Sequence, residues 1–282
     1  MTASRYAGQR AALLTQHGKQ TVIAPVLETG LGCAIVHVDS FDTDTLGTFT
    51  RETARAGSQL DAARAKACKG MELTGLPIAL ASEGSFGPDP FAGMFTWDVE
   101  LLLWRDDELG IEVTGIAQGP ACSAHFKTSD LAELEAFAAT EGFPEHHLVL
   151  RPEHEDDPRM HKGIADAQAL RAAFEACRAL AANQTVHVET DMRAFANPTR
   201  MALIAEASEN LLLRLRSCCP ACSTPGYWKT AQQPGLPCAA CGRPTRNYLS
   251  ETWSCVRCAH QSVEIRRDRS REDPANCAYC NP

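Results

Sequence analysis

Four C-x-x-C motifs near the end of the chain are the residues whose type and spacing most directly predict chemistry. CPAC, CAAC, CVRC and CAYC form the first to fourth cysteine pairs: Cys219 and Cys222, Cys238 and Cys241, Cys255 and Cys258, Cys277 and Cys280. A C-x-x-C turn directs two thiolates at one metal ion, and two such turns complete a tetrahedral zinc site. Four pairs therefore predict two zinc ions, which are structural because four cysteines leave no open coordination position.

The spacing of the motifs leaves their pairing open. Gaps of 15 residues between the first two pairs and 18 between the last two suit zinc modules. We favour sequential pairing, the first pair with the second and the third with the fourth; a cross-braced arrangement would join the first pair with the third. Cys218 is an alternative ligand beside Cys219. Disulfides or a redox dithiol are the competing interpretation, but the start MTASRYAGQR lacks the apolar segment of a secretory signal.

Charge is unevenly distributed along the chain. The net charge of −8 over 282 residues divides into −11 for residues 1–216 and +3 for residues 217–282. An acidic body disfavours nonspecific binding to nucleic-acid phosphates, but it allows a small phosphorylated substrate that a metal ion bridges to carboxylates. No segment approaches the roughly 18 apolar residues of a membrane span. We expect a cytoplasmic protein without a membrane partner, and nothing in the sequence indicates an oligomeric state.

Apolar periodicity in residues 1–216 predicts strands that alternate with helices. Strands are expected at residues 11–15, 33–39, 77–82, 146–152 and 185–189, and as a hairpin at 98–104 and 111–117. Helices are expected after Lys19 and at residues 58–73, 129–142, 164–182 and 198–216. This order predicts an α/β fold with a mixed sheet and flanking helices in residues 1–216. A small double zinc-ribbon module would follow in residues 217–282.

Polar side chains gather where several predicted strands end, which is where open α/β sheets bind ligands. Acids suit Mg²⁺, and basic side chains suit phosphate oxygens. Glu83 would hold a metal ion or orient the attacking water, while Asp191 and Glu189 would share binding of Mg²⁺. The expected phosphate-binding residues are Thr15, His17, Lys19, Ser85, Arg193 and Arg200. The competing interpretation is that such residues are loop side chains, helix caps and surface ion pairs.

Further features of these strand ends belong to the same prediction. Asp39, Asp42 and Asp44 follow the strand at residues 33–39. Asn197 and Pro198 are a natural N-cap and first residue of the helix that follows, whose free N–H groups can bind an anion.

Two resemblances are carried by short motifs. HGK, DTDTLGTFT, ASEGSFGPDP, ETDMRAFANPTRM and the terminal cysteine pairs resemble a bacterial family known as a domain of unknown function, over nearly the whole chain. Residues 11–116 are distantly similar to the inosine triphosphate pyrophosphatase-like superfamily, with LLTQHGK, DAARAKA and PIALASEGSFG in corresponding order. This second resemblance implies a nucleotide hydrolase in which Glu83 takes the acidic role. The chain departs from it in lacking a clear metal carboxylate in the first helix and a GFGYDP-like segment.

Two functions from different classes follow. The first is a Mg²⁺-dependent hydrolase of nucleoside triphosphates or a related phosphorylated metabolite, with the zinc ribbons as scaffold. The second is a binding or adaptor protein without catalysis, in which residues 217–282 recognise protein or RNA. Its basic and aromatic residues would form the binding surface: Arg243, Arg246, Arg257, Arg266, Arg267, Arg269, Arg271, Tyr248 and Trp253. Oligomerisation through the ribbons is a third possibility.

Overall fold

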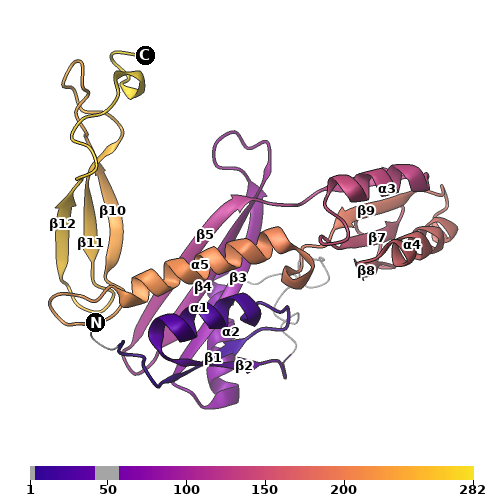
Figure 1. The fold of residues 1–282 in the computed structure, drawn as a ribbon, viewed down its shortest axis with the longest axis horizontal. Coiled ribbons are helices and arrows are strands. Elements are labelled where there is room, and N and C mark those ends of the chain that lie inside the picture. The colour runs from indigo at the N-terminus through magenta and orange to yellow at the C-terminus, as the bar shows by residue number, and fades with distance from the viewer. Residues whose placement is uncertain (1–3, 42–56) are drawn as a thin grey trace. The chain divides into compact units, whose positions relative to one another are not determined.

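A computed structural model describes residues 4–41 and 57–282 of the chain, so Asp42 and Asp44 lie outside the described residues (Figure 1). The chain divides into two compact units. Unit 1 consists of residues 1–105 and 114–212, and unit 2 consists of residues 106–113 and 213–282.

A five-stranded sheet forms the centre of unit 1, in the order β2-β1-β3-β4-β5. Its strands are β1 (Arg10–Leu14), β2 (Ala34–Val38), β3 (Ile78–Pro88), β4 (Thr96–Asp106) and β5 (Ile111–Pro120). β1 pairs in parallel with both β2 and β3. Short loops join β3 to β4 and β4 to β5, and parallel neighbours need a crossover of about a dozen residues or more, so these pairs are antiparallel. The predicted α/β fold with a mixed sheet is confirmed.

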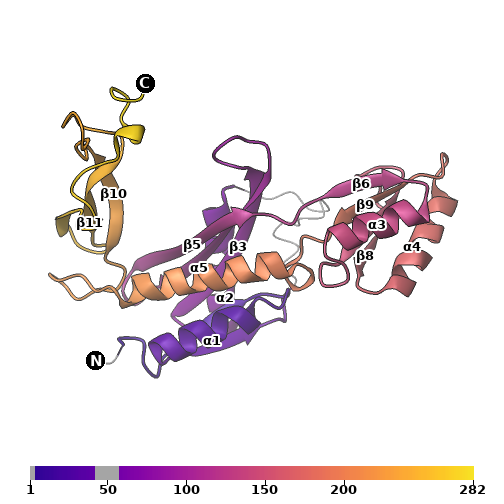
Figure 2. The ribbon, with the colours of Figure 1, turned by 45° about the horizontal axis from the view of Figure 1, so that its top comes forward.

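Three helices pack on this sheet: α1 (Gln20–Leu31), α2 (Gln59–Thr74) and α5 (Pro198–Arg216). α2 lies against β1 and β3 through small residues such as Ala63 and Ala67, which are fully buried with Leu103 of β4. α5 approaches β5 so closely that a Cβ on Gly115 would lie 2.5 Å from the Cβ of Leu211. Figures 1 and 2 show α5 beside α1.

A second sheet in unit 1 has four strands in the order β6-β9-β7-β8. They are β6 (His125–Thr128), β7 (Leu148–Pro152), β8 (His161–Ile164) and β9 (Val186–Thr190), and every pair is antiparallel. Helices α3 (Leu131–Thr140) and α4 (Ala167–Leu180) pack on it around an apolar core that includes Phe174 (Figure 2). β6 and β8 were not predicted, because each has only four residues, and β8 follows a charged loop.

Unit 2 contains a three-stranded antiparallel sheet, in the order β10-β11-β12. Its strands are β10 (Trp228–Pro234), β11 (Tyr248–Ser254) and β12 (Gln261–Ile265). Short 3₁₀ turns occur at Ala194–Ala196 and Pro274–Asn276. Across the described parts of the chain, no helix has the length and apolar character needed to span a membrane.

Candidate functional site

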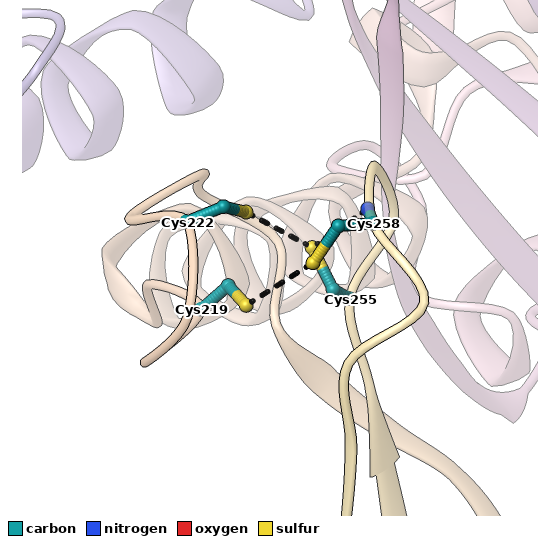
Figure 3. Close-up of side chains that lie close together, drawn as sticks. All are labelled: Cys219, Cys222, Cys255 and Cys258. Carbon is teal, nitrogen blue, oxygen red and sulfur yellow. Dashed lines mark hydrogen bonds between the residues drawn. The ribbon is translucent and has the colours of Figure 1, made fainter.

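The eight cysteines of the four C-x-x-C motifs form two separate clusters (Figure 3). Site 1 joins the first and third pairs, and site 2 joins the second and fourth pairs: Cys219, Cys222, Cys255 and Cys258 in the one, and Cys238, Cys241, Cys277 and Cys280 in the other. The sulfur atoms of each cluster all lie within 4.8 Å of one another. The sequential pairing that we favoured from the spacing is therefore wrong, and the module is cross-braced.

The strands of unit 2 explain this interleaving. β10 lies between the first and second pairs, β11 between the second and third, and β12 between the third and fourth. Because each strand carries the chain from one end of the sheet to the other, successive pairs fall at opposite ends. The first pair therefore meets the third, and the second meets the fourth.

The sulfur positions fit tetrahedral zinc. Four thiolates at the usual Zn–S distance of about 2.3 Å are separated from one another by about 3.8 Å. In site 1 the Sγ atoms of Cys219 and Cys258 lie 3.8 Å apart, and those of Cys222 and Cys255 lie 3.6 Å apart. The corresponding distances in site 2 are 3.9 Å and 3.8 Å. A disulfide would need about 2.05 Å, so the geometry matches metal ligation. Each cluster can hold one zinc ion, which would be closed to substrate.

Hydrogen bonds in the cysteine turns favour the thiolate form that zinc requires. The hydrogen bond with Thr224 lowers the pKa of Cys222 to about 6. The backbone N–H of Cys280 leads the interactions that lower the pKa of Cys277 to about 7. Cys218 lies outside both clusters, so it is not a ligand of either site.

Glu272 fixes the loops around site 2. It is fully buried, and its carboxylate accepts hydrogen bonds from Asn247 Nδ2 at 2.7 Å and Asn276 Nδ2 at 2.9 Å. Its backbone is bridged to Cys238. A carboxylate this deeply buried needs such partners, and it ties the loops of the second and fourth pairs together.

A separate cluster of buried charges lies in unit 1, where β1 and β3 approach their carboxyl ends. Glu100 of β4 is fully buried, and its Oε1 accepts a hydrogen bond from Arg200 Nε at 2.5 Å. Lys19 Nζ lies 3.8 Å from Glu100 Oε2 and donates to Ser82 Oγ at 3.2 Å. Both cations are also buried, and burial, opposed by Glu100, lowers the pKa of Lys19 to about 8. The structure thus brings together two predicted phosphate-binding residues, Lys19 and Arg200.

Asp98 adjoins this cluster. It lies two residues before Glu100 on β4, so both side chains point to the same face of the sheet. Only 1% of Asp98 is exposed, and its Oδ1 has no hydrogen-bond partner among the described residues. Burial, followed by the charge of Glu100, raises the pKa of Asp98 to about 7. We call Lys19, Ser82, Asp98, Glu100 and Arg200 the buried charge cluster.

Glu83 lies on the other side of β3 from this cluster. Its carboxylate forms a 2.5 Å ion pair with Lys66 of α2. The next residue, Gly84, faces the opposite way, because an added Cβ there would collide with Glu100 and Arg200. Gly84 is therefore required for the close packing of the cluster, and Glu100, not Glu83, is the carboxylate between the two cations.

The two other predicted carboxylates have different basic partners. Asp191 pairs with Arg193, whose Nε lies 3.0 Å from Asp191 Oδ1, and it also accepts from the backbone of Gly163. Glu189 accepts from Arg151 at 3.2 Å, an interaction within the second sheet. Among the described residues, the only groups of three or more possible ligands within 4.8 Å are the two cysteine sites. The structure does not gather Glu83, Asp191 and Glu189 around one ion.

The remaining predicted residues lie near the ends of β1, β3 and β9. The ring of His17 stacks on Phe195 with centroids 6.1 Å apart, and Arg193 lies over the same ring at 4.8 Å. Thr15 is buried just after β1, and Ser85 is half-buried in β3. Asn197 caps α5 as expected, since its Oδ1 accepts from the backbone N–H of Arg200 at 3.0 Å.

Sequence reasoning missed Asp98 and Glu100. The segment TWDVELLLW was interpreted only as one strand of a hairpin. Two acids at alternate positions of an otherwise apolar strand share one face, and that face is the buried one. This pattern was the available signal, because carboxylates are rarely buried without a partner.

Comparison with known proteins gives a family without an established activity. No curated protein matches the chain. The resemblance to the inosine triphosphate pyrophosphatase-like superfamily finds no support in these comparisons. The family described as "Domain of unknown function (DUF6671)" matches residues 66–282, which include β3, β4, α5 and both cysteine clusters. The chain therefore belongs to this DUF6671 family.

Proposed function

We propose that unit 1 hydrolyses a nucleoside triphosphate or a related phosphorylated metabolite with Mg²⁺, and that the two zinc sites are structural. One observation carries the proposal: Lys19 and Arg200 converge on Glu100 at the carboxyl ends of β1 and β3. Ligands of open α/β sheets bind at this edge. Two buried cations beside two carboxylates also provide the charges that phosphoryl transfer requires.

Exchange of partners would make this cluster a binding site. In the protein alone, Glu100 neutralises both Lys19 and Arg200. A phosphate group would take over the two cations, since Arg and Lys bind phosphate oxygens well. The carboxylates of Glu100 and Asp98 would then be available for Mg²⁺. This ion needs only one or two protein carboxylates when it also binds substrate phosphates. Mg²⁺ would supply neutralisation of phosphate charge.

Substitutions on β4 and α5 test the proposal. Phosphate and pyrophosphate release from a panel of nucleotides with Mg²⁺ should be measured for the native chain, Glu100→Gln and Arg200→Gln. Glu72→Gln is the matched control, because Glu72 is an exposed carboxylate whose side chain bonds to Lys69 of the same helix. We expect turnover by the native chain and the control, and a loss of about 100-fold or more in the other two variants. Absence of turnover, or equal turnover in all variants, would contradict the proposal.

A second candidate function is binding without catalysis, through residues 217–282, to RNA or protein. It is favoured by arginines that stack on aromatic rings in this segment. The guanidinium carbon of Arg243 lies 3.6 Å from the ring centroid of Tyr279, and that of Arg266 lies 4.1 Å from the ring of Tyr248. Such pairs offer positive charge and flat surfaces together. Binding of labelled RNA or protein by the zinc-loaded chain, in the absence of hydrolysis, would favour this candidate.

A further inference from the structure

A groove beside site 2 has the composition of an anion-binding surface. Its volume is about 970 Å³, and it is formed entirely by residues of unit 2 between Pro234 and Pro282. Arg243, Arg246 and Tyr279 line it, together with Asn276 and Asn281. This volume lies within the range of about 300–1,000 Å³ that small-molecule sites occupy, so the groove has room for a nucleotide.

The arginines of this groove are available to a ligand. Neither Arg243 nor Arg246 is in an ion pair within the described parts of the chain, and both are exposed. The groove lining contains no aspartate or glutamate. Nearby arginines differ, because Arg266 and Arg269 are paired with Asp268. The positive charge of the groove is therefore not neutralised by protein carboxylates.

A flat surface accompanies this charge. Tyr279 is 61% exposed, and the guanidinium of Arg243 stacks on its ring at 3.6 Å. Nucleic-acid bases stack on tyrosine rings and on guanidinium planes, and this stacking is independent of base sequence. The amide side chains of Asn276 and Asn281 add hydrogen-bonding groups on the same wall.

The zinc sites confine this attraction to the groove. Eight thiolates and two Zn²⁺ together carry −4, which changes the +3 of residues 217–282 to −1. Attraction over the whole segment is thus excluded, and only a ligand that enters the groove would gain from its arginines. An unstacked strand presents both features that the groove matches, a flat base and a phosphate.

We propose that the groove lined by Arg243, Arg246 and Tyr279 binds single-stranded nucleic acid, with a base on the Arg243–Tyr279 stack and a phosphate at Arg246. The inference rests on the second candidate function and is independent of hydrolysis in unit 1. An acidic peptide would also be attracted by the arginines, but it would leave the stacking surface unused.

Fluorescence anisotropy with the full, zinc-loaded chain tests this inference. The probe is a labelled oligouridine, with the equivalent single-stranded DNA, a duplex and a polyglutamate peptide as separate arms. Arg243→Gln/Arg246→Gln is compared with Arg257→Gln/Arg267→Gln, which removes the same charge from exposed arginines outside the groove. Tyr279→Ala tests the stack. Zinc content of each variant confirms that both sites are intact.

We expect both single-stranded probes to bind better than the duplex. The groove double variant should weaken binding at least 10-fold and lower the slope of log K against log salt by about 1.4, about 0.7 for each lost phosphate contact. Tyr279→Ala should weaken binding about 5-fold or more at any salt concentration. The inference is overturned by absence of oligonucleotide binding, by preference for duplex or polyglutamate, or by equal losses in the two double variants. Hydrolysis by unit 1 is measured separately, so either function can fail alone.

Discussion

Interleaved pairing of the cysteines predicts which sets of four substitutions preserve a zinc ion. Serine at all four positions of the first and third pairs removes site 1 and leaves site 2 complete. Serine at the first and second pairs removes the same number of thiolates but leaves two cysteines in each site. We therefore expect one tightly bound zinc ion in the first variant and none in the second. Sequential pairing predicts the reverse.

The magnitude follows from how little apolar surface the module buries. Within residues 217–282, the only buried apolar side chains other than cysteines are Tyr227 and Leu236. At about 1.5–3 kcal/mol for each, they contribute about 3–6 kcal/mol. A structural zinc ion contributes about 10–16 kcal/mol at neutral pH. Zinc, more than the apolar core, should therefore hold the fold of this module.

Zinc analysis after dialysis against a weak chelator measures the retained ions, and proteolysis reports the fold of residues 217–282. The native chain should retain two ions and resist cleavage. Removal of all zinc with a strong chelator should expose residues 217–282 to protease. If the variant lacking the first and second pairs retains one ion while the variant lacking the first and third pairs retains none, the cross-braced assignment is refuted.

Three further substitutions test the sites. Asp98→Asn should stabilise the metal-free chain increasingly from pH 4 to pH 7, by up to about 4 kcal/mol, because a folded-state pKa raised to about 7 disfavours the ionised carboxylate; urea unfolding across pH checks this, and a constant difference would contradict it. Gly84→Ala should cost about 1–3 kcal/mol of unfolding free energy, because the new Cβ overlaps Arg200; a neutral effect would exclude the tight packing. Glu272→Ala should release the zinc of site 2 to a chelator before that of site 1, since it unties the loops; simultaneous release would oppose this role.

Local signals in the sequence were sufficient where neighbouring residues determine the structure. Ser58 and Asp61 form the expected capping box at the start of α2, and Asn197 caps α5. Both motifs act within a single helical turn, so they require no knowledge of the rest of the fold. The cysteine pairs were equally clear, because two thiols in one turn already fix half of a metal site.

Long-range assembly was not accessible in the same way. The segment ending at Glu189 was correctly predicted as a strand, but it belongs to the second sheet, beside β6 and β7. Propensity and periodicity describe one strand at a time and do not state its neighbours. The expected meeting of Glu83, Asp191 and Glu189 assumed one sheet, and the structure contains two in unit 1. The interleaved zinc sites depend on strand crossings in the same way.

The parity of residues along β3 decides which acid belongs to the buried charge cluster. In SEGS, Glu83 is the visible acid, but it points to α2 and pairs with Lys66. Gly84 points to the other face, where its missing side chain leaves space for Glu100 and Arg200. The motif therefore contributes to the cluster through the residue without a side chain. A search of sequences for charged residues alone passes over such a position, whereas the alternation of β4 places Asp98 and Glu100 on one buried face.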